Sequence, residues 1–109
     1  MTEKCSSSGL EAAIEILGGR WKAMILFHLF SSSVMRFSEL HRAIKGISQK
    51  MLIQQLRDLE DAGVVTRRVY PEVPPKVEYS LTAAGLALQP SLQALQDWAT
   101  SRYKNLEQQ

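Results

Sequence analysis

Apolar residues in the first third of the chain recur at helical spacing. From Leu10 to Leu17 they fall at intervals of three and four residues, which is typical of an amphipathic helix with one buried face. Ser8 is placed to cap this helix and a glycine pair to end it, so we expect a helix over residues 8–17. Over residues 20–30 apolar side chains cover most of the helix circumference, which predicts a second, centrally buried helix.

Shorter elements are predicted in the middle of the chain. A serine run over residues 31–33 predicts a loop, and residues 34–37 follow as a very short strand. The pattern then predicts a helix over residues 38–44, capped by its first residue, Ser38. A further helix over residues 48–62 is capped in the same way by a serine and buries a stripe of leucines.

The last third of the chain begins with a predicted hairpin. Residues 64–70 and 76–81 contain alternating apolar and polar positions, and the proline-rich segment 71–75 between them makes a rigid tip. Thr82 is expected to cap a final helical region. Within that region Pro90 either interrupts the helix or opens a second one in its first turn.

This order of elements predicts a mainly α-helical fold with a small β-hairpin wing, the winged helix-turn-helix. The helices over residues 38–44 and 48–62 are joined by a tight turn that contains Gly46, as in a helix-turn-helix. In that motif the second helix enters the major groove of DNA. Because 109 residues suffice for one hydrophobic core, we expect a single domain over residues 1–109, whose DNA-reading part spans residues 37–81.

The outward face of the predicted helix over residues 48–62 carries side chains that suit DNA. A glutamine amide can bond adenine through one donor and one acceptor, and lysine or arginine can reach guanine or phosphate. Ile53 can contact a thymine methyl group, or it is simply an exposed apolar residue. A polar face of this kind is also usual for a solvated helix. The predicted contact residues on this helix are Ser48, Gln49, Lys50, Ile53, Gln54 and Arg57.

The preceding helix and the wing extend the predicted interface. Ser38 and His41 lie on that helix, where we expect His41 to be exposed and to touch a phosphate. Adjacent strand residues point to opposite faces, so only one of Arg67 and Arg68 faces DNA from a regular strand. We expect Arg68 and Lys76, which lie nearer the hairpin tip, to hold the DNA backbone without specifying the sequence.

Charge supports a polyanionic partner only weakly. The formal net charge is +2, with 13 Lys and Arg against 11 Asp and Glu. The positive excess lies in the middle, because residues 36–76 hold eight Lys and Arg but five Asp and Glu, a net +3, whereas the rest of the chain is −1. The charge therefore agrees with the order of elements but does not establish DNA binding.

Composition argues against an enzyme, a metal site and a membrane span. Cys5 is the one cysteine, so no internal disulfide and no cysteine cluster for zinc is expected, and a reduced, cytoplasmic setting fits. No signal peptide is visible, and the longest apolar run, residues 23–30, is far shorter than the roughly 20 residues that span a bilayer. Neither His28 nor His41 has a nucleophile and a carboxylate at catalytic spacing, so we expect no enzymatic activity and no cofactor.

Five sequence runs together resemble the HxlR family of bacterial winged-helix regulators, which are related in fold to the MarR regulators. The resemblance extends over about residues 8–98, most of the chain. It is highly specific because the runs occur together and in order. They are ILGGRWK at residues 16–22, RFSEL at 36–40, GISQKML at 46–52, LRDLE at 56–60 and VYPEVPPKVEYSLT at 69–82.

The resemblance implies a homodimer that binds double-stranded DNA at an inverted-repeat operator and controls nearby genes, and we expect it to act as a repressor. The dimer would form through the first and last helices, over residues 8–30 and 83–105. Apolar Leu92, Leu95 and Trp98 fit such an interface, although they can equally cover the buried second helix. A winged-helix module that docks on another protein without binding DNA is the alternative.

The N-terminus departs from the family pattern. Many members of the family carry a cysteine at the start of the first helix, and some use it to sense oxidants. Ser8 occupies that position here, and a serine cannot form a thiolate. Cys5 lies three residues earlier beside Lys4, and cysteines near a helix start or a basic residue can have a lowered pKa. Cys5 is therefore a candidate redox-sensing residue, although a lone exposed cysteine is more often inert. The sequence names no effector.

Overall fold

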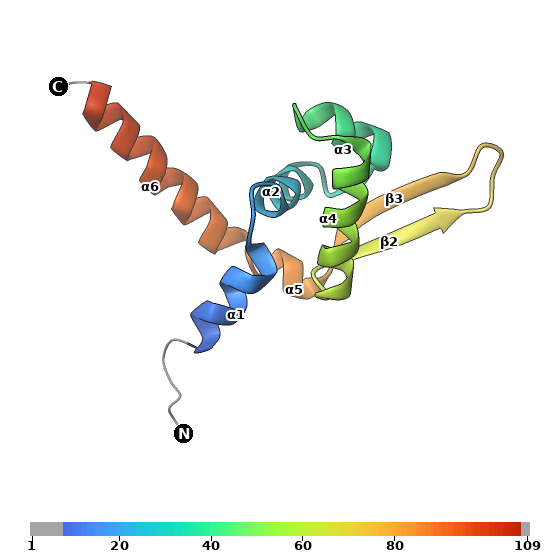
Figure 1. Ribbon diagram of the computed structural model, residues 1–109, viewed down its shortest axis with the longest axis horizontal. Helices are drawn as coiled ribbons and strands as arrows, with labels where there is room; N and C mark the ends of the chain where they lie inside the picture. Colours follow the sequence, from blue (N-terminus) through green and yellow to red (C-terminus); the bar gives the residue numbers. More distant parts are fainter. Residues whose placement is uncertain (1–7, 108–109) are drawn as a thin grey trace.

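The computed structural model describes residues 8–107, and a small sheet extends from one side of its helices (Figure 1). The elements follow the predicted order, with α5 added between the hairpin and the last helix. In chain order they are α1 (Ser8–Leu17), α2 (Lys22–Ser32), β1 (Val34–Arg36), α3 (Phe37–Ala43), α4 (Gln49–Asp61), β2 (Val65–Tyr70), β3 (Lys76–Leu81), α5 (Ala83–Leu86) and α6 (Gln89–Glu107). The mainly helical fold with a β-hairpin wing is thus confirmed.

The wing is part of a three-stranded antiparallel sheet with strand order β1-β3-β2. The hairpin register runs from Val65 opposite Leu81 to Tyr70 opposite Lys76. The short strand predicted before the third helix pairs with β3 over three residues, with Met35 opposite Tyr79. Sequence patterning found β1 but not its partner, because three residues carry too little alternation to specify pairing.

The core is centred on α2, as its nearly continuous apolar surface predicts. Ile25, Leu26 and Leu29 are completely buried, and each contributes about 1.5–3 kcal/mol through burial of its side chain. The leucine stripe of α4 packs against them, with Leu52 and Leu59 fully buried. This contact fixes the inward face of α4, so the opposite face of that helix is the one left to solvent.

The predicted cap of the third helix is wrong. The helix α3 starts at Phe37, one residue before Ser38, which is an exposed residue inside its first turn. The backbone N–H of Arg36 donates to Glu39 Oε1 at 2.8 Å, and this bond closes the helix start. A glutamate three residues into a helix can satisfy the backbone N–H at its start, and here it displaces the serine cap.

Two further boundaries depend on context beyond the local pattern. The loop predicted over residues 31–33 is wrong, because α2 continues through Ser32 and ends where Ser33 has a φ of +68°. Serine is a modest helix former rather than a breaker, so the helix continues through these two exposed serines. Pro90 lies in the first turn of α6, where its missing N–H costs no helical hydrogen bond. Of the two alternatives for Pro90, the opening of a second helix is therefore correct.

The reading head and the terminal helices lie on opposite sides of the molecule. Figure 1 shows α1 and α6 projecting away from the body on one side, while the β2–β3 hairpin extends on the other. Thr82 fastens the base of the hairpin, since its hydroxyl donates to the Gly63 carbonyl at 2.7 Å and accepts from the Gly85 N–H at 3.1 Å. Within residues 8–107, no helix is both long and apolar enough to cross a bilayer.

Candidate nucleic-acid interface

The start of α4 is fixed by the predicted serine cap. Ser48 Oγ accepts a hydrogen bond from the Met51 backbone N–H at 3.0 Å. This bond satisfies one of the amides that a helix start leaves unpaired. Because leucines hold the opposite face in the core, the predicted contact residues of α4 are all exposed. They are Gln49, Lys50, Ile53, Gln54 and Arg57, together with Ser48 at the cap.

His41 does not have the exposure expected of a residue that projects toward DNA. It is half-buried, and its Nε2 donates to the Ile47 carbonyl oxygen at 3.1 Å. Its ring is stacked on that of Phe37, with centroids 6.3 Å apart. The imidazole therefore ties α3 to the turn before α4, because a donor on α3 meets a backbone carbonyl that the turn leaves without a helical partner. The position of His41 stabilises the helix-turn-helix geometry.

Gln54 has a partner on its own helix. Its Nε2 donates to Asp58 Oδ1 at 3.0 Å, one turn later. The other carboxylate oxygen of Asp58 lies 3.4 Å from Lys22 Nζ at the start of α2. Sequence analysis did not foresee this connection, although the spacing of four residues between Gln54 and Asp58 was visible and is one at which helical side chains meet.

The predicted pair of wing cations lies on one face of the hairpin. In the register, Arg68 is opposite Glu78 and Tyr70 is opposite Lys76, so all four residues share that face. The Arg68 guanidinium is 5.0 Å from the centroid of the Tyr70 ring, and the Lys76 ammonium is 4.3 Å from it. Lys76 also pairs with Glu78 at 3.7 Å. Tyr70, which sequence analysis did not single out, thus lies between the two cations.

Arg67 lies on the other face of the same strand. Its Nε is 3.6 Å from Glu60 Oε1 on α4, and it is opposite the buried Tyr79 in the hairpin register. Burial raises the pKa of Tyr79, while the nearby charge of Arg67 partly opposes this shift. Arg67 is therefore paired with a residue of α4, whereas Arg68 lies on the outer face of the wing.

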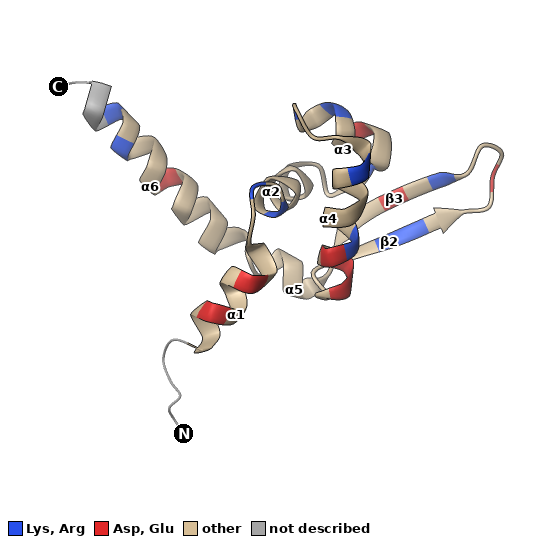
Figure 2. Cartoon of the chain, in the orientation of Figure 1, with Lys and Arg blue, Asp and Glu red and all other residues tan. Residues whose placement is uncertain are grey.

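Charged side chains are unevenly distributed over the elements. Figure 2 shows lysine and arginine along α3, the upper part of α4 and both strands of the wing. Acidic residues gather at the end of α4 and on α1, and single acidic residues lie on α3, on β3 and at the tip of the hairpin. Lysine and arginine thus outnumber aspartate and glutamate over residues 36–76, which include the exposed start of α4 and the wing, as expected of a DNA-contacting surface.

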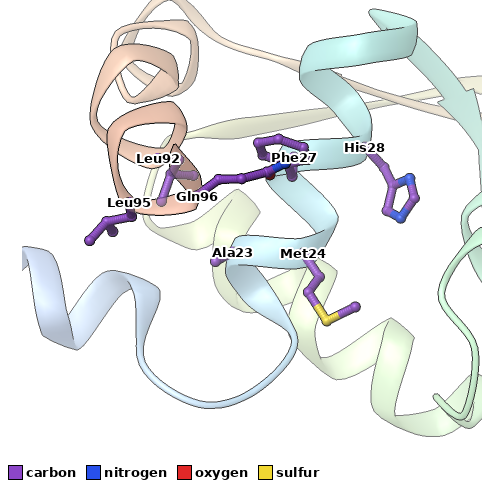
Figure 3. A pocket seen from close by; sticks show the side chains of 7 residues that line it. All are labelled: Ala23, Met24, Phe27, His28, Leu92, Leu95 and Gln96. Carbon is purple, nitrogen blue, oxygen red and sulfur yellow. The ribbon is translucent and has the colours of Figure 1, made fainter. Parts of the chain in front are cut away.

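The terminal helices expose large apolar side chains. On α6, Leu92 is buried against the body, but residues one and two turns later are not. The side chains that line a pocket between α2 and α6, drawn in Figure 3, are Ala23, Met24, Phe27, His28, Leu92, Leu95 and Gln96. The exposed fractions on the two helices are 63% for Leu10, 60% for Ile14, 59% for Leu95, 65% for Trp98 and 68% for Tyr103. Leu92 therefore helps to cover α2, whereas Leu95 and Trp98 remain available to a partner.

Cys5, the candidate redox-sensing residue, lies outside the described residues. Ser8 is the first residue of α1.

Comparisons with known proteins agree with this geometry. A family model described as HxlR-like helix-turn-helix matches residues 16–107. The HTH-type transcriptional regulator YkvN of Bacillus subtilis (strain 168) is 51% identical over 92 residues, which are 84% of this chain and 77% of that protein.

Solved structures show the same fold at substantial sequence identity. The redox regulator HypR in its reduced form matches with a TM-score of 0.85 and 41% identity, over 94% of this chain and 100% of that chain. The reduced form of the transcriptional regulator YodB from B. subtilis matches with a TM-score of 0.75 and 42% identity, over 87% of this chain and 92% of that chain. The chain therefore belongs to the HxlR-like helix-turn-helix family, and it is a DNA-binding transcriptional regulator with a winged-helix fold and not an enzyme.

Proposed function

We propose that this regulator binds an inverted-repeat operator as a homodimer and represses the genes beside it. The observation that carries the proposal is the arrangement of α4. Its leucine face is buried and its polar face is exposed, and the wing extends on the side of the molecule away from the terminal helices (Figure 1). One helix and one wing can read a few base pairs, so a second copy is needed for a site of useful length.

Within this interface, α4 reads bases and the neighbouring elements hold the backbone. Glutamine, lysine and arginine on the exposed face suit adenine, guanine and phosphate, and an isoleucine suits a thymine methyl group. The residues proposed to face bases are Gln49, Lys50, Ile53, Gln54 and Arg57. The residues proposed to face the sugar-phosphate backbone are Ser38, Ser48, Arg68 and Lys76, while His41 holds α3 against the turn before α4.

The exposed apolar surface of α1 and α6 supports the dimer. Leu10 and Ile14 on α1, and Leu95, Trp98 and Tyr103 on α6, project from helices that point away from the reading head. Contiguous apolar surface of this kind is typical of an interface, and two-fold homodimers are the commonest assembly of soluble proteins. Pairing through α1 and α6 leaves both reading heads free, with their recognition helices about 34 Å apart, one turn of DNA.

The experiment that tests the proposal compares substitutions in the two groups of residues. Replacement of Gln49 and Gln54 by alanine should relax the sequence preference, because each amide can discriminate between bases by about 1–3 kcal/mol. Replacement of Arg68 or Lys76 should weaken binding to all DNA alike. Titration of labelled operator duplex at several salt concentrations measures both effects. Unchanged affinity in all four variants would contradict the proposed reading head.

The alternative function, docking on another protein, makes the opposite prediction for free DNA. A docking module should bind neither a selected operator nor random duplex at low salt, where the electrostatic part of DNA binding is strongest. The basic face of the wing and the exposed amides on α4 favour the DNA-binding proposal.

A further inference from the structure

Two charged residues in the family-like sequence runs have no part in the proposed interface. Lys22 closes the first run and Asp58 lies in the fourth, yet the structure brings them together. The Lys22 ammonium lies 3.4 Å from Asp58 Oδ2, which joins the first residue of α2 to the last turn of α4. The Lys22 side chain is only 14% exposed, so water screens this ion pair less than it screens a surface pair.

Each of these charges is poorly placed for its own helix. A helix start carries a partial positive charge, which disfavours Lys22 at the beginning of α2. A helix end carries a partial negative charge, which disfavours Asp58 in the last turn of α4. Pairing between the helices offsets both penalties. The presence of these two residues is therefore explained by the ion pair that they form between α2 and α4. Neither residue stabilises its own helix.

The carboxylate of Asp58 also fixes the orientation of Gln54. Asp58 Oδ1 accepts from Gln54 Nε2 at 3.0 Å, and an ionised carboxylate has no hydrogen to donate. A flipped amide would place Gln54 Oε1 against the carboxylate oxygen, which is repulsive. The bond thus holds the amide with its nitrogen toward Asp58. It leaves one N–H and the Oε1 of Gln54, which are the donor and acceptor that match N7 and N6 of adenine.

We propose that Asp58, held by Lys22, is a positioning residue that sets which base Gln54 reads. The inference rests on the proposed function, since it requires Gln54 to face a base. Asp58 keeps the Gln54 amide in one of its two orientations before DNA arrives. The helix α2, which has no contact with DNA in the proposed complex, thereby contributes to sequence specificity through Lys22.

The test substitutes Asp58 with asparagine and measures discrimination rather than affinity. The amide of D58N can donate or accept, so both orientations of Gln54 are satisfied. Dissociation constants are measured for the operator and for duplexes with each base pair of the half-site changed in turn. We expect Q54A to lose about tenfold discrimination at one A·T pair, and D58N to lose about threefold at that same pair. The lost negative charge strengthens binding to every duplex alike and cancels in the ratio.

Glu60 supplies a matched control on the other flank of α4. The variant E60Q removes the same charge and breaks the ion pair with Arg67, but it leaves Gln54 and Asp58 in place. Its discrimination should equal that of the unmodified protein at every base pair. A second variant, K22Q, keeps the Asp58 carboxylate but removes its anchor, and it should lose discrimination at the same A·T pair as Q54A. It provides an independent test if D58N is poorly folded.

The double variant Q54A/D58N separates positioning from a general structural effect. If Asp58 acts through Gln54, D58N causes no further loss of discrimination once Gln54 is absent. The inference is overturned if Q54A loses discrimination but D58N and K22Q do not, or if D58N has the same effect with and without Gln54. If Q54A changes discrimination at no base pair, the base-reading role of Gln54 in the proposed function is itself contradicted.

Discussion

At the scale of single residues, strand alternation decides which of two neighbouring arginines is available to DNA. Arg67 pairs with Glu60 on α4, whereas Arg68 lies over the Tyr70 ring on the outer face of the wing. The opposite directions follow from the period of two along a strand. The period of two does not predict which residues the arginines contact. Glu60 lies near Arg67 because α4 packs against the hairpin, and Tyr70 lies near Arg68 because of the hairpin register.

The two arginines should therefore respond differently to removal. R68A loses a phosphate contact and should weaken binding to operator and unrelated DNA alike. The slope of log affinity against log salt concentration should be smaller in magnitude by about one, since one phosphate contact is lost. R67A, the matched control, loses a partly exposed ion pair and should keep the slope of the unmodified protein. Equal slopes for R68A and the unmodified protein would exclude Arg68 from the interface.

Tyr79 links burial to alkaline stability. Burial raises its pKa above the usual 10.0, so the folded state holds the phenolic proton to higher pH than the unfolded state does. The stability that this proton supplies is complete below about pH 10 and is lost as pH rises through the raised pKa. We expect the free energy of unfolding to fall more steeply in the unmodified protein than in Y79F above that pH. Urea unfolding at a series of pH values measures the difference, and parallel curves would contradict the assignment.

At the scale of elements, strong periodic patterns were predictable and boundaries were not. The apolar surface of α2, the leucine stripe of α4 and the cap at Ser48 were each visible in the sequence. The start of α3 was not, because Glu39 and Ser38 compete to close the same helix end and their local patterns are equally good. The half-buried position of His41 was missed for a related reason, since its partner, Ile47, lies in the turn beyond the helix.

The two serines give a direct comparison of a true cap with a wrongly predicted one. S48A removes the acceptor for the Met51 N–H and should destabilise the protein by about 1 kcal/mol. S38A replaces an exposed residue inside a helix and should change stability by less than about 0.5 kcal/mol. Chemical denaturation of both variants gives the two free energies. A loss in S38A as large as that in S48A would show that the helix starts are wrongly assigned.

At the scale of the whole molecule, the sequence predicts the division between a reading head and terminal helices. The patterns alone do not decide whether the apolar residues of α6 pack on the core or contact a partner. Apolar positions on a helix face can serve the core or a partner. The structure separates them, because Leu92 is buried while Leu95 and Trp98, farther along α6, are exposed. The connection of Lys22 through Asp58 to Gln54 was also beyond sequence reasoning, since 36 residues separate the two charged partners.

The exposed apolar residues of α6 should control assembly. W98E places a charge in the proposed interface and should weaken the dimer at least tenfold, because buried tryptophans are common hot spots. V73E changes a fully exposed apolar residue at the wing tip and should leave the dimer intact. Sedimentation velocity over a range of concentrations measures the monomer–dimer equilibrium. A W98E protein that remains dimeric would exclude this face of α6 as the interface.

The most direct test of the central claim is selection of bound duplexes from a random DNA pool at low salt, followed by sequencing. A two-fold symmetric reader with one recognition helix per copy predicts an enriched inverted repeat. Its half-sites should be centred about 10–10.5 base pairs apart, one turn of DNA. Enrichment of no sequence, or of a single half-site without its inverted copy, would contradict the account.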